Sequence, residues 1–189
     1  MQAYAAGDVL AFTRLYERHE GGTYRFIARC LAGHAGGGVA DELHQDVWLA
    51  VTRQAARYEP RARFTTWLYT LTRHRVIDHV RRVQTAGGPA QSLDADEGED
   101  DAPPLDALVS DASHDPVHRL ETAQQARAFL SAVEALPAGQ REAFLLQAEA
   151  GLSIDEIAQA TGVGLETAKS RLRYARTRLR QALAAWFTP

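Results

Sequence analysis

Apolar residues recur every three or four positions along most of the chain, and this spacing predicts α-helices. The clearest example lies near the carboxyl end, where one helix would carry six apolar residues on a single side. These residues are Leu165, Ala168, Leu172, Ala175, Leu179 and Leu183. A shorter stripe of Ile154, Ile157 and Ala158 comes just before them. The same spacing in the other segments leads us to predict an all-α protein.

Residues 152–186 combine two of these helices into a predicted helix-turn-helix motif. Ser153 and Glu156 have the S-x-x-E spacing of a capping box, which marks the start of the first helix. Gly162 and Gly164 flank a single valine, and glycine allows the positive φ that a sharp turn between helices requires. We therefore expect the turn at these glycines and an unusually long second helix after it.

The second helix has a strongly cationic side. From Lys169 to Arg180 the chain has six basic residues and no acidic residue. Short polar side chains lie near the start of this helix and arginines follow, an order that suits a recognition helix entering the major groove of DNA. A basic face is also common on the solvated helices of plain bundles. The capping box, the glycine turn and the single sign of charge together favour DNA binding.

Five further helical segments are expected upstream, separated by stretches rich in glycine, proline or acidic residues. Their ranges are 3–33 (a helix pair, or one helix broken at Gly21–Gly22), 41–58, 64–83, 116–136 and 139–150. This grouping predicts two small helical domains, residues 1–83 and 116–189, joined by a flexible linker at 84–115.

Charge is distributed unevenly along the chain, whose formal net charge is −3. Residues 84–118 hold nine acidic residues and no lysine or arginine, whereas residues 1–83 hold 12 arginines and 8 acidic residues. Because local charge governs affinity for nucleic acid, both predicted domains remain compatible with DNA binding. The acidic linker is expected to be a solvated tether. A second hypothesis is that it competes with DNA for the basic faces.

The composition offers little for catalysis or for a cofactor. Cys30 is the single cysteine, so no intramolecular disulfide is possible, and we expect it to be a small core residue in a reducing cytoplasm. No apolar run approaches the length of a membrane span, so a soluble intracellular chain is expected. His74, Asp78 and His79 resemble a metal-ligand set, but the spacing turns His79 away and is not that of H-E-x-x-H. We expect no metal, no cofactor and no enzymatic activity.

Two upstream segments carry candidate binding residues. In the segment 64–83, Tyr69 and several arginines fall outside the expected apolar face, and aromatic rings beside guanidinium groups suit single-stranded DNA. Phe64 and Trp67 in the same segment are also compatible with an ordinary core. In the segment 41–58, Trp48 lies beside acidic residues, where an exposed tryptophan would anchor a protein partner and a buried one would be a core edge residue.

Four segments together resemble the bacterial sigma-70 family of RNA polymerase sigma factors, in its extracytoplasmic-function (ECF) subgroup. They are GDVLAFTRLYERH (7–19), ADELHQDVWLAV (40–51), RYEPRARFTTWLYTLTRHRVIDHVRR (57–82) and the stretch from LPAGQREAF to RLRQAL (136–183). They occur in the order of the family and cover most of the chain outside the linker. Three positions differ from the residues common in the family, namely His74 for asparagine, Tyr174 for arginine and Ala168 for valine.

The resemblance implies a role for each segment. It implies core RNA polymerase as a partner, through the β′ clamp helices and the β subunit. Binding to the β′ clamp helices is implied for Asp41, Leu43, Gln45, Asp46 and Trp48. Recognition and opening of the −10 promoter element is implied for Arg61, Arg63, Phe64, Tyr69, Arg73, His74, Arg81 and Arg82. Recognition of the −35 element is implied for Glu166, Thr167, Lys169, Ser170, Arg171, Arg173, Tyr174 and Arg176. The subgroup also implies a separate anti-sigma protein that holds the activity in check.

A different class of regulator also ends in a helix-turn-helix motif. Such proteins bind duplex operators, commonly as dimers whose two-fold symmetry matches the site. The N-terminal half of this chain shows no signature of a ligand pocket and has its own helix of arginines and aromatic residues, which favours the sigma factor. Binding to core polymerase distinguishes the two classes.

Overall fold

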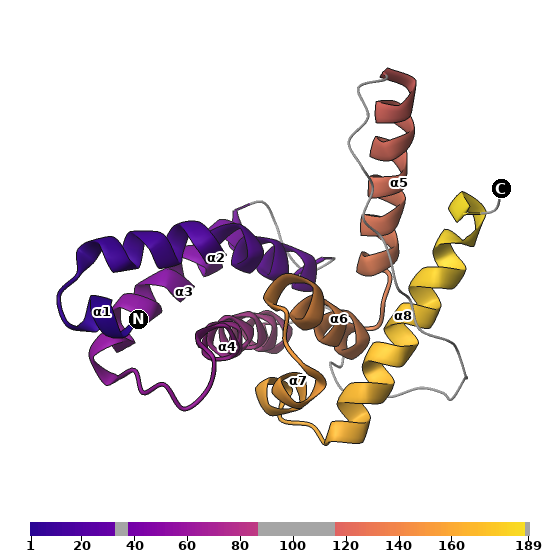
Figure 1. Ribbon diagram of the computed structural model, residues 1–189. Coiled ribbons are helices and arrows are strands. Elements are labelled where there is room, and N and C mark those ends of the chain that lie inside the picture. The colour runs from indigo at the N-terminus through magenta and orange to yellow at the C-terminus, as the bar shows by residue number, and fades with distance from the viewer. Residues whose placement is uncertain (33–37, 87–115, 188–189) are drawn as a thin grey trace.

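A computed structural model describes residues 1–32, 38–86 and 116–187 (Figure 1). The predicted all-α class is confirmed, because the elements of this part of the chain are helices. They are α1 (Gln2–Ala5), α2 (Val9–Cys30), α3 (Val39–Gln54), a 3-10 turn (Ala55–Arg57), α4 (Phe64–Thr85), α5 (Pro116–Glu134), α6 (Ala138–Ala150), α7 (Ile154–Thr161) and α8 (Leu165–Phe187). The predicted linker at 84–115 lies outside the described residues from position 87 onwards.

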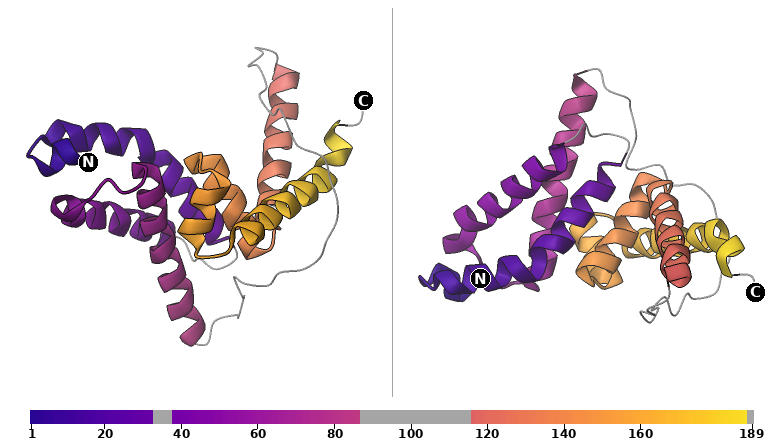
Figure 2. Two further views of the ribbon diagram at one scale, coloured as in Figure 1. Left: turned by 60° about the horizontal axis from the view of Figure 1, so that its bottom comes forward. Right: turned by 90° about the horizontal axis from the view of Figure 1, so that it is seen from above.

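The N-terminal lobe, α1 to α4, forms around the apolar faces of its three long helices. Helices α2 and α3 lie alongside each other and α4 crosses them (Figure 2). Fully buried side chains from each helix meet in the centre, among them Phe26, Val47 and Leu68. Burial of a side chain of this size contributes about 1.5–3 kcal/mol, so the contact of the three helices holds this lobe together.

Helix α2 is continuous, and the predicted break at Gly21–Gly22 is wrong. The helix begins at the N-cap residue Asp8, whose Oδ1 accepts a 3.1 Å hydrogen bond from the backbone N–H of Ala11. Glycine weakens a helix interior by only about 0.5–1 kcal/mol, which packing overcomes. Gly22 also has a packing reason, because a Cβ there would lie 2.6 Å from the hydroxyl of Tyr69.

The helix-turn-helix motif is confirmed in its details. The hydroxyl of Ser153 accepts from the backbone N–H of Glu156 at 3.3 Å, and the Glu156 carboxylate accepts from the backbone N–H of Ser153 at 2.9 Å. Gly162 has φ +73°, the left-handed conformation that the turn requires. Five of the six apolar residues predicted along α8 are buried, whereas Leu165 is 47% exposed because it lies at the first position of the helix, beyond the packed stripe.

The two lobes are in contact, and the C-terminal lobe comprises α5 to α8. Helix α6 packs against α2 and α4, and α7 packs against α4. Figures 1 and 2 show α6 and α7 beside the N-terminal lobe, with α8 on the far side of them. Buried residues of both lobes belong to one continuous apolar cluster, so residues more than 100 positions apart in the sequence share a core.

Candidate nucleic-acid and polymerase interfaces

The predicted −35 residues lie on α8, which the buried stripe fixes in rotation. Ala168, Leu172 and Ala175 face the C-terminal lobe and are almost fully buried. The opposite side therefore faces solvent, and Glu166, Lys169 and Arg173 are exposed there, three and four residues apart. The Lys169 ammonium lies 3.8 Å from the Glu166 carboxylate, an exposed pair that contributes little to stability and leaves both groups accessible.

Other predicted −35 residues are partly or largely covered. Thr167, Ser170 and Arg176 are half-buried, and an Arg176 guanidinium nitrogen donates to Oε1 of Gln147 on α6 at 2.7 Å. Arg171 is 7% exposed and Tyr174 is 9% exposed, so neither side chain is open to a ligand in this conformation. Arg173 extends over the Tyr174 ring, with 5.0 Å between the guanidinium carbon and the ring centroid. Tyr174 therefore supports an exposed arginine.

The predicted −10 residues are divided between exposed and covered positions. Arg61 and Arg63 precede α4 and are exposed, as are His74, Arg81 and Arg82 along the helix. Phe64 is half-buried against Tyr58 and Trp67, with ring centroids 6.1 Å and 5.8 Å away. This cluster of aromatic rings starts the helix next to the exposed arginines.

Tyr69 and Arg73 instead face the C-terminal lobe. Tyr69 is 1% exposed, so the expectation that it is open to solvent or DNA is wrong for this conformation. Its ring packs edge-on against Phe26, and its hydroxyl donates to the backbone carbonyl of Glu149 at 3.2 Å. Burial raises the pKa of this hydroxyl above its ordinary value. Arg73 donates through Nε to Oε1 of Glu142 at 2.8 Å.

The predicted polymerase-binding residues lie on α3 and divide in the same way. Asp41, Gln45 and Asp46 are exposed, and Asp41 and Gln45 are one helical turn apart with Leu49 a turn further on. Leu43 and Trp48 are buried, at 2% and 5% exposure. The expectation of an exposed Trp48 is therefore wrong, and the alternative of a core position holds, because α2 supplies aromatic partners for the indole.

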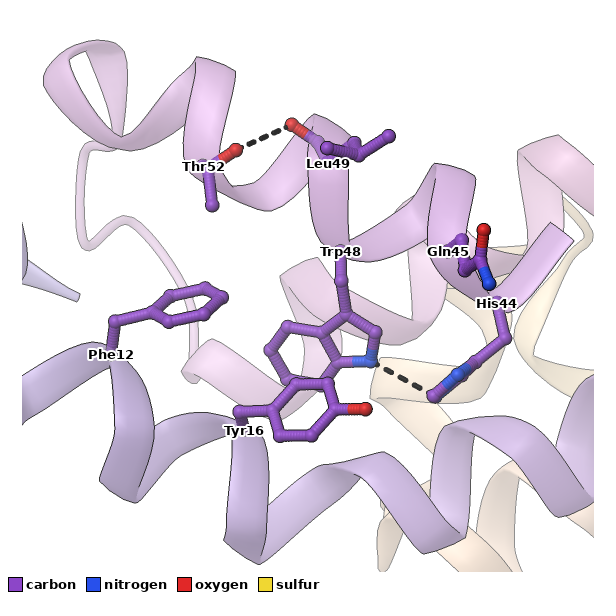
Figure 3. Close-up of a pocket in the computed structure, with 7 residues that line it drawn as sticks. All are labelled: Phe12, Tyr16, His44, Gln45, Trp48, Leu49 and Thr52. Carbon is purple, nitrogen blue, oxygen red and sulfur yellow. Dashed lines mark hydrogen bonds between the residues drawn. The ribbon is translucent and has the colours of Figure 1, made fainter. Parts of the chain in front are cut away.

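A groove of about 450 Å³ lies between α2 and α3 over this tryptophan (Figure 3). Its lining residues are Phe12, Tyr16, His44, Gln45, Trp48, Leu49 and Thr52. The Trp48 ring lies at its floor, with ring centroids 4.9 Å from Tyr16 and 5.9 Å from Phe12. The exposed Leu49 and Gln45 lie at its edge on α3. The surface next to Asp41 and Gln45 is thus apolar and concave, whereas Asp46 lines a separate hollow with Arg75, Asp78, Arg81 and Arg82 of α4.

A hydrogen bond holds the indole in this orientation. Nε1 of Trp48 donates to Nε2 of His44 at 3.0 Å, as Figure 3 shows. The same His44 nitrogen lies 3.1 Å from Thr23 Oγ1 and 3.1 Å from the backbone carbonyl of Glu20 on α2. Burial of the ring lowers the pKa of His44, although the Glu20 carbonyl acts in the opposite direction. The neutral imidazole is the form that accepts from Trp48.

Three glutamates with no role in the sequence predictions contact the predicted −10 lobe. Glu149 pairs with Arg25 at 2.9 Å and with Arg29, and Glu142 pairs with Arg73. Glu156 accepts from the Thr66 hydroxyl at 2.7 Å, and lies 3.5 Å from Arg63. No local pattern indicates such pairs, because the partners are 69 to 124 positions apart in the chain. Their only signal is a regular spacing of seven residues among the three acids.

The described parts of the chain contain neither a metal-ligand cluster nor a membrane span. Among residues 1–32, 38–86 and 116–187, no three histidine, cysteine or acidic side chains gather closely enough to hold a metal ion. No described helix is both long and apolar enough to cross a bilayer. Cys30 is a free thiol, half-buried against the core, and burial raises its pKa.

Comparison with known proteins identifies the family of the chain. The sigma-70 region 2 family matches residues 15–85, and the sigma-70 region 4 family matches residues 126–179. RNA polymerase sigma factor CarQ of Myxococcus xanthus is 31% identical over 183 residues, covering 97% of this chain and 95% of CarQ. ECF RNA polymerase sigma factor SigK of Mycobacterium sp. (strain KMS) is 30% identical, covering 92% of this chain and 83% of SigK.

The fold agrees with this assignment. A solved structure of the sigma factor RpoE with the anti-sigma factor NepR from Bartonella quintana matches with a TM-score of 0.62 and 21% identity, covering 93% of this chain and 98% of that one. CnrH in complex with the cytosolic domain of CnrY matches with a TM-score of 0.60 and 22% identity, covering 96% and 92%. These two likenesses concern the fold alone. On the sequence relatives and the two family matches, the chain belongs to the ECF subgroup of the sigma-70 family, the sigma factors that direct core RNA polymerase to promoters.

Proposed function

We propose that this sigma factor divides promoter recognition between its two lobes. The C-terminal lobe, residues 116–189, reads the −35 element as duplex through α8. The N-terminal lobe, residues 1–83, binds core polymerase through α3 and the −10 element through α4 and the loop before it. Residues 84–115 link the lobes. The observation that carries the proposal is the exposed face of Glu166, Lys169 and Arg173, set opposite the buried stripe of α8.

The geometry of α8 suits duplex DNA. Helix α7 begins at a capping box, the Gly162 turn redirects the chain, and α8 presents its N-terminal residues beyond the lobe. In a helix-turn-helix motif, these N-terminal residues reach base edges in the major groove. Lys169 and Arg173 carry the ammonium and guanidinium donors that bind guanine edges or phosphates. The arginines that follow Arg173 lie further along α8, where they would contact the phosphates of the DNA backbone.

The −10 function is assigned to the arginines and rings around the start of α4. Arg61 is open to a ligand just before α4, beside the aromatic cluster of Phe64, and His74, Arg81 and Arg82 are exposed further along the helix. Single-stranded DNA is bound by rings that stack on bases and by cations that contact phosphates. No covalent chemistry is involved: the lobe binds the unpaired strand better than the duplex, and the free energy of that binding favours the melted promoter.

Polymerase binding is assigned to the exposed side of α3. Asp41, Gln45 and Asp46 supply polar contacts, and the groove over Trp48 supplies apolar area beside Gln45. Leu43 and Trp48 act here by fixing α3, since both are buried.

Because the polymerase is cytoplasmic, the chain works in the cytoplasm. One solved structure of similar fold holds the sigma factor RpoE with the anti-sigma factor NepR, and the other holds CnrH with the cytosolic domain of CnrY. We propose an anti-sigma partner for this chain as well.

The proposed function is tested by mixing the purified chain with core polymerase that lacks a sigma subunit. We expect a stable complex on gel filtration and run-off transcripts from a subset of a promoter library. A conventional helix-turn-helix regulator would bind duplex DNA alone, would leave the core polymerase unbound and would yield no transcript. Gln45→Ala with Asp46→Ala should weaken the complex, and Asp155→Asn, an exposed acid on α7 away from α3, serves as the matched control.

A further inference from the structure

An aromatic side chain of α8 holds one of the arginines assigned to the −35 element. The guanidinium carbon of Arg173 lies 5.0 Å from the centroid of the Tyr174 ring. Nη2 of Arg173 also donates a 3.2 Å hydrogen bond to the Tyr174 hydroxyl. The tyrosine therefore offers the guanidinium two attractions, the electron-rich face of its ring and the lone pairs of its oxygen.

The backbone of α8 does not impose this contact. Successive residues of an α-helix project about 100° apart, so the side chains of adjacent residues do not face each other. Arg173 reaches Tyr174 only because its long side chain bends sideways over the surface of the helix. The contact thus depends on these two side chains, and a substitution of Tyr174 should release Arg173 without altering the course of the helix.

The two partners differ in their freedom to move. Tyr174 is 9% exposed, so the surrounding lobe restricts its ring, whereas Arg173 is exposed. An exposed arginine has many rotamers, and ordering them opposes binding to a ligand. A guanidinium that already rests on a fixed ring loses less of this freedom when DNA binds. Tyr174 is accordingly the fixed partner and Arg173 the side chain that it preorganises.

The contact leaves Arg173 able to bind DNA. Its partner is a neutral hydroxyl, and the bond uses one of the guanidinium hydrogens while the others remain for a bidentate contact with guanine O6 and N7. Arg73 on α4 is held differently, because its Nε donates to the Glu142 carboxylate, which offsets its charge, and its side chain is only 15% exposed. Arg173 keeps its charge, its exposure and most of its donors.

We propose that Tyr174 is a positioning residue for −35 recognition, which holds the Arg173 guanidinium in the orientation for a bidentate contact with one guanine. Tyr174 sets the preference for that base through Arg173 and does not itself bond to a base. This inference rests on the proposed −35 role of Arg173. Lys169, on the same exposed face of α8, pairs instead with Glu166, so its base preference is independent of the tyrosine.

The test uses the complete holoenzyme, assembled from the full-length chain and core polymerase, on a promoter that it transcribes. Each base pair of the −35 element is replaced in turn, and competition binding gives the ratio of affinities for the cognate and the altered promoter. Arg173→Ala identifies the base pair whose ratio depends on Arg173, and Lys169→Ala identifies the one that depends on Lys169. These two base pairs then serve as the target and the matched control.

Two substitutions of the tyrosine separate its ring from its hydroxyl. Tyr174→Phe keeps the ring and removes the acceptor of the hydrogen bond, and Tyr174→Leu removes both. Far-ultraviolet circular dichroism and thermal unfolding check that each variant is folded, and Tyr174→Phe carries the test if leucine is not tolerated in the lobe. Both substitutions are also made in the Arg173→Ala background, which completes a double-mutant cycle.

We expect Tyr174→Leu to lower the ratio at the Arg173 base pair about 2- to 5-fold, the factor that corresponds to an exposed cation–π contact. Tyr174→Phe should lower it by a smaller factor, because the ring remains. The ratio at the Lys169 base pair should not change in either variant. In the Arg173→Ala background, neither substitution of the tyrosine should change any ratio.

The other outcomes overturn the inference, and they differ from a failure of the proposed function. An equal loss of affinity for all −35 sequences would mean that Tyr174 only stabilises the lobe. A loss of discrimination that persists in the Arg173→Ala background would mean that the tyrosine contacts DNA itself. Unchanged ratios in every folded Tyr174 variant would also contradict the inference. If Arg173→Ala changes no ratio, the proposed −35 role of Arg173 fails and the inference with it, and if the wild-type chain forms no holoenzyme, the proposed function as a whole fails.

Discussion

The indole nitrogen of Trp48 donates a 3.0 Å hydrogen bond to Nε2 of His44, and this bond lies beneath the groove next to the proposed polymerase-binding residues. Both side chains project from α3, one helical turn apart, toward the aromatic residues of α2. The imidazole packs between Trp48 and α2, with Nε2 3.1 Å from Thr23 Oγ1 and 3.1 Å from the Glu20 carbonyl oxygen. The neutral imidazole is the form that can accept the Trp48 hydrogen bond at the floor of the groove.

The lowered pKa of His44 predicts a loss of stability at acid pH. When the folded chain has the lower pKa, the unfolded chain binds more protons, so the free energy of unfolding increases with pH across that interval. The contribution is complete above the ordinary value of 6.5 and is lost as pH falls below it. The groups around the ring are Tyr16, Tyr24 and the Glu20 carbonyl, with Asp41 acting at longer range.

Urea unfolding between pH 7.5 and pH 5 measures this effect. His19 also has a lowered pKa, from burial and from Arg18, and acts in the same direction. The control is therefore His19→Gln, in which the free energy of unfolding should keep the part of its pH dependence that is due to His44. In His44→Gln, only the part due to His19 should remain. A slope unchanged by His44→Gln would show that this imidazole does not titrate on unfolding.

The adjacent glycines of α2 should respond differently to alanine. Gly21→Ala meets only the flexible end of Arg25 at 3.2 Å, so the gain in helix propensity should raise stability by about 0.5–1 kcal/mol. Gly22→Ala places its Cβ 2.6 Å from the Tyr69 hydroxyl and 3.5 Å from the Glu149 carbonyl, so it should lose that gain and loosen the hydrogen bond between the lobes. Thermal unfolding compares the two variants, and equal stabilisation of both would contradict the close contact.

The capping box should carry a measurable part of the stability of the C-terminal lobe. Ser153→Ala removes the acceptor for the Glu156 backbone N–H at the start of α7 and should cost about 0.5–2 kcal/mol. Ser170→Ala on α8, whose hydroxyl only bonds back to the Thr167 carbonyl, is the control for loss of a hydroxyl. Chemical denaturation followed by circular dichroism gives both values. A Ser153→Ala cost no larger than that of Ser170→Ala would mean that the cap is not needed.

Lys169 and Arg173 should set the choice of −35 sequence. Replacing either side chain with alanine removes its hydrogen bonds to a base edge, which should reduce discrimination at that base by about 1–3 kcal/mol. The measurement is transcription by the holoenzyme from a cognate promoter and from −35 point variants of it. Arg178→Ala, an exposed arginine further along α8, is the control, and it should weaken all −35 sequences equally. Unchanged transcription in both Lys169→Ala and Arg173→Ala would contradict the assignment.

Local sequence patterns predicted the helices of this chain and the orientation of α8. The capping box of Ser153 and the left-handed Gly162 are short-range features, and the stripe through Ala168 and Leu172 has a period that only one helix face satisfies. The resemblance to the family then supplied partners for α3, α4 and α8. The break expected at Gly21–Gly22 failed because packing between distant segments, here Tyr69 against Gly22, outweighs local propensity.

Burial of individual site residues could not be predicted in the same way. Trp48 and Tyr69 have amphipathic side chains that suit either a core or a binding surface, and which of these holds depends on the helix that packs against them. For Tyr69 that helix is α6, whose Glu149 carbonyl comes 80 positions later in the chain. The pairing of Arg73 with Glu142 likewise depends on how the lobes meet, and no periodicity within one helix encodes such a contact.

The division of the promoter between the two lobes is tested most directly by site-specific photo-crosslinking in the holoenzyme. One photoreactive group replaces Thr177 on α8 and another replaces Thr70 on α4, each a residue next to a proposed DNA face but outside the assigned set. On a promoter that the holoenzyme transcribes, we expect the α8 probe to mark the −35 duplex and the α4 probe to mark the non-template −10 strand. Crosslinks from both probes to one element, or from neither to DNA, would contradict the account.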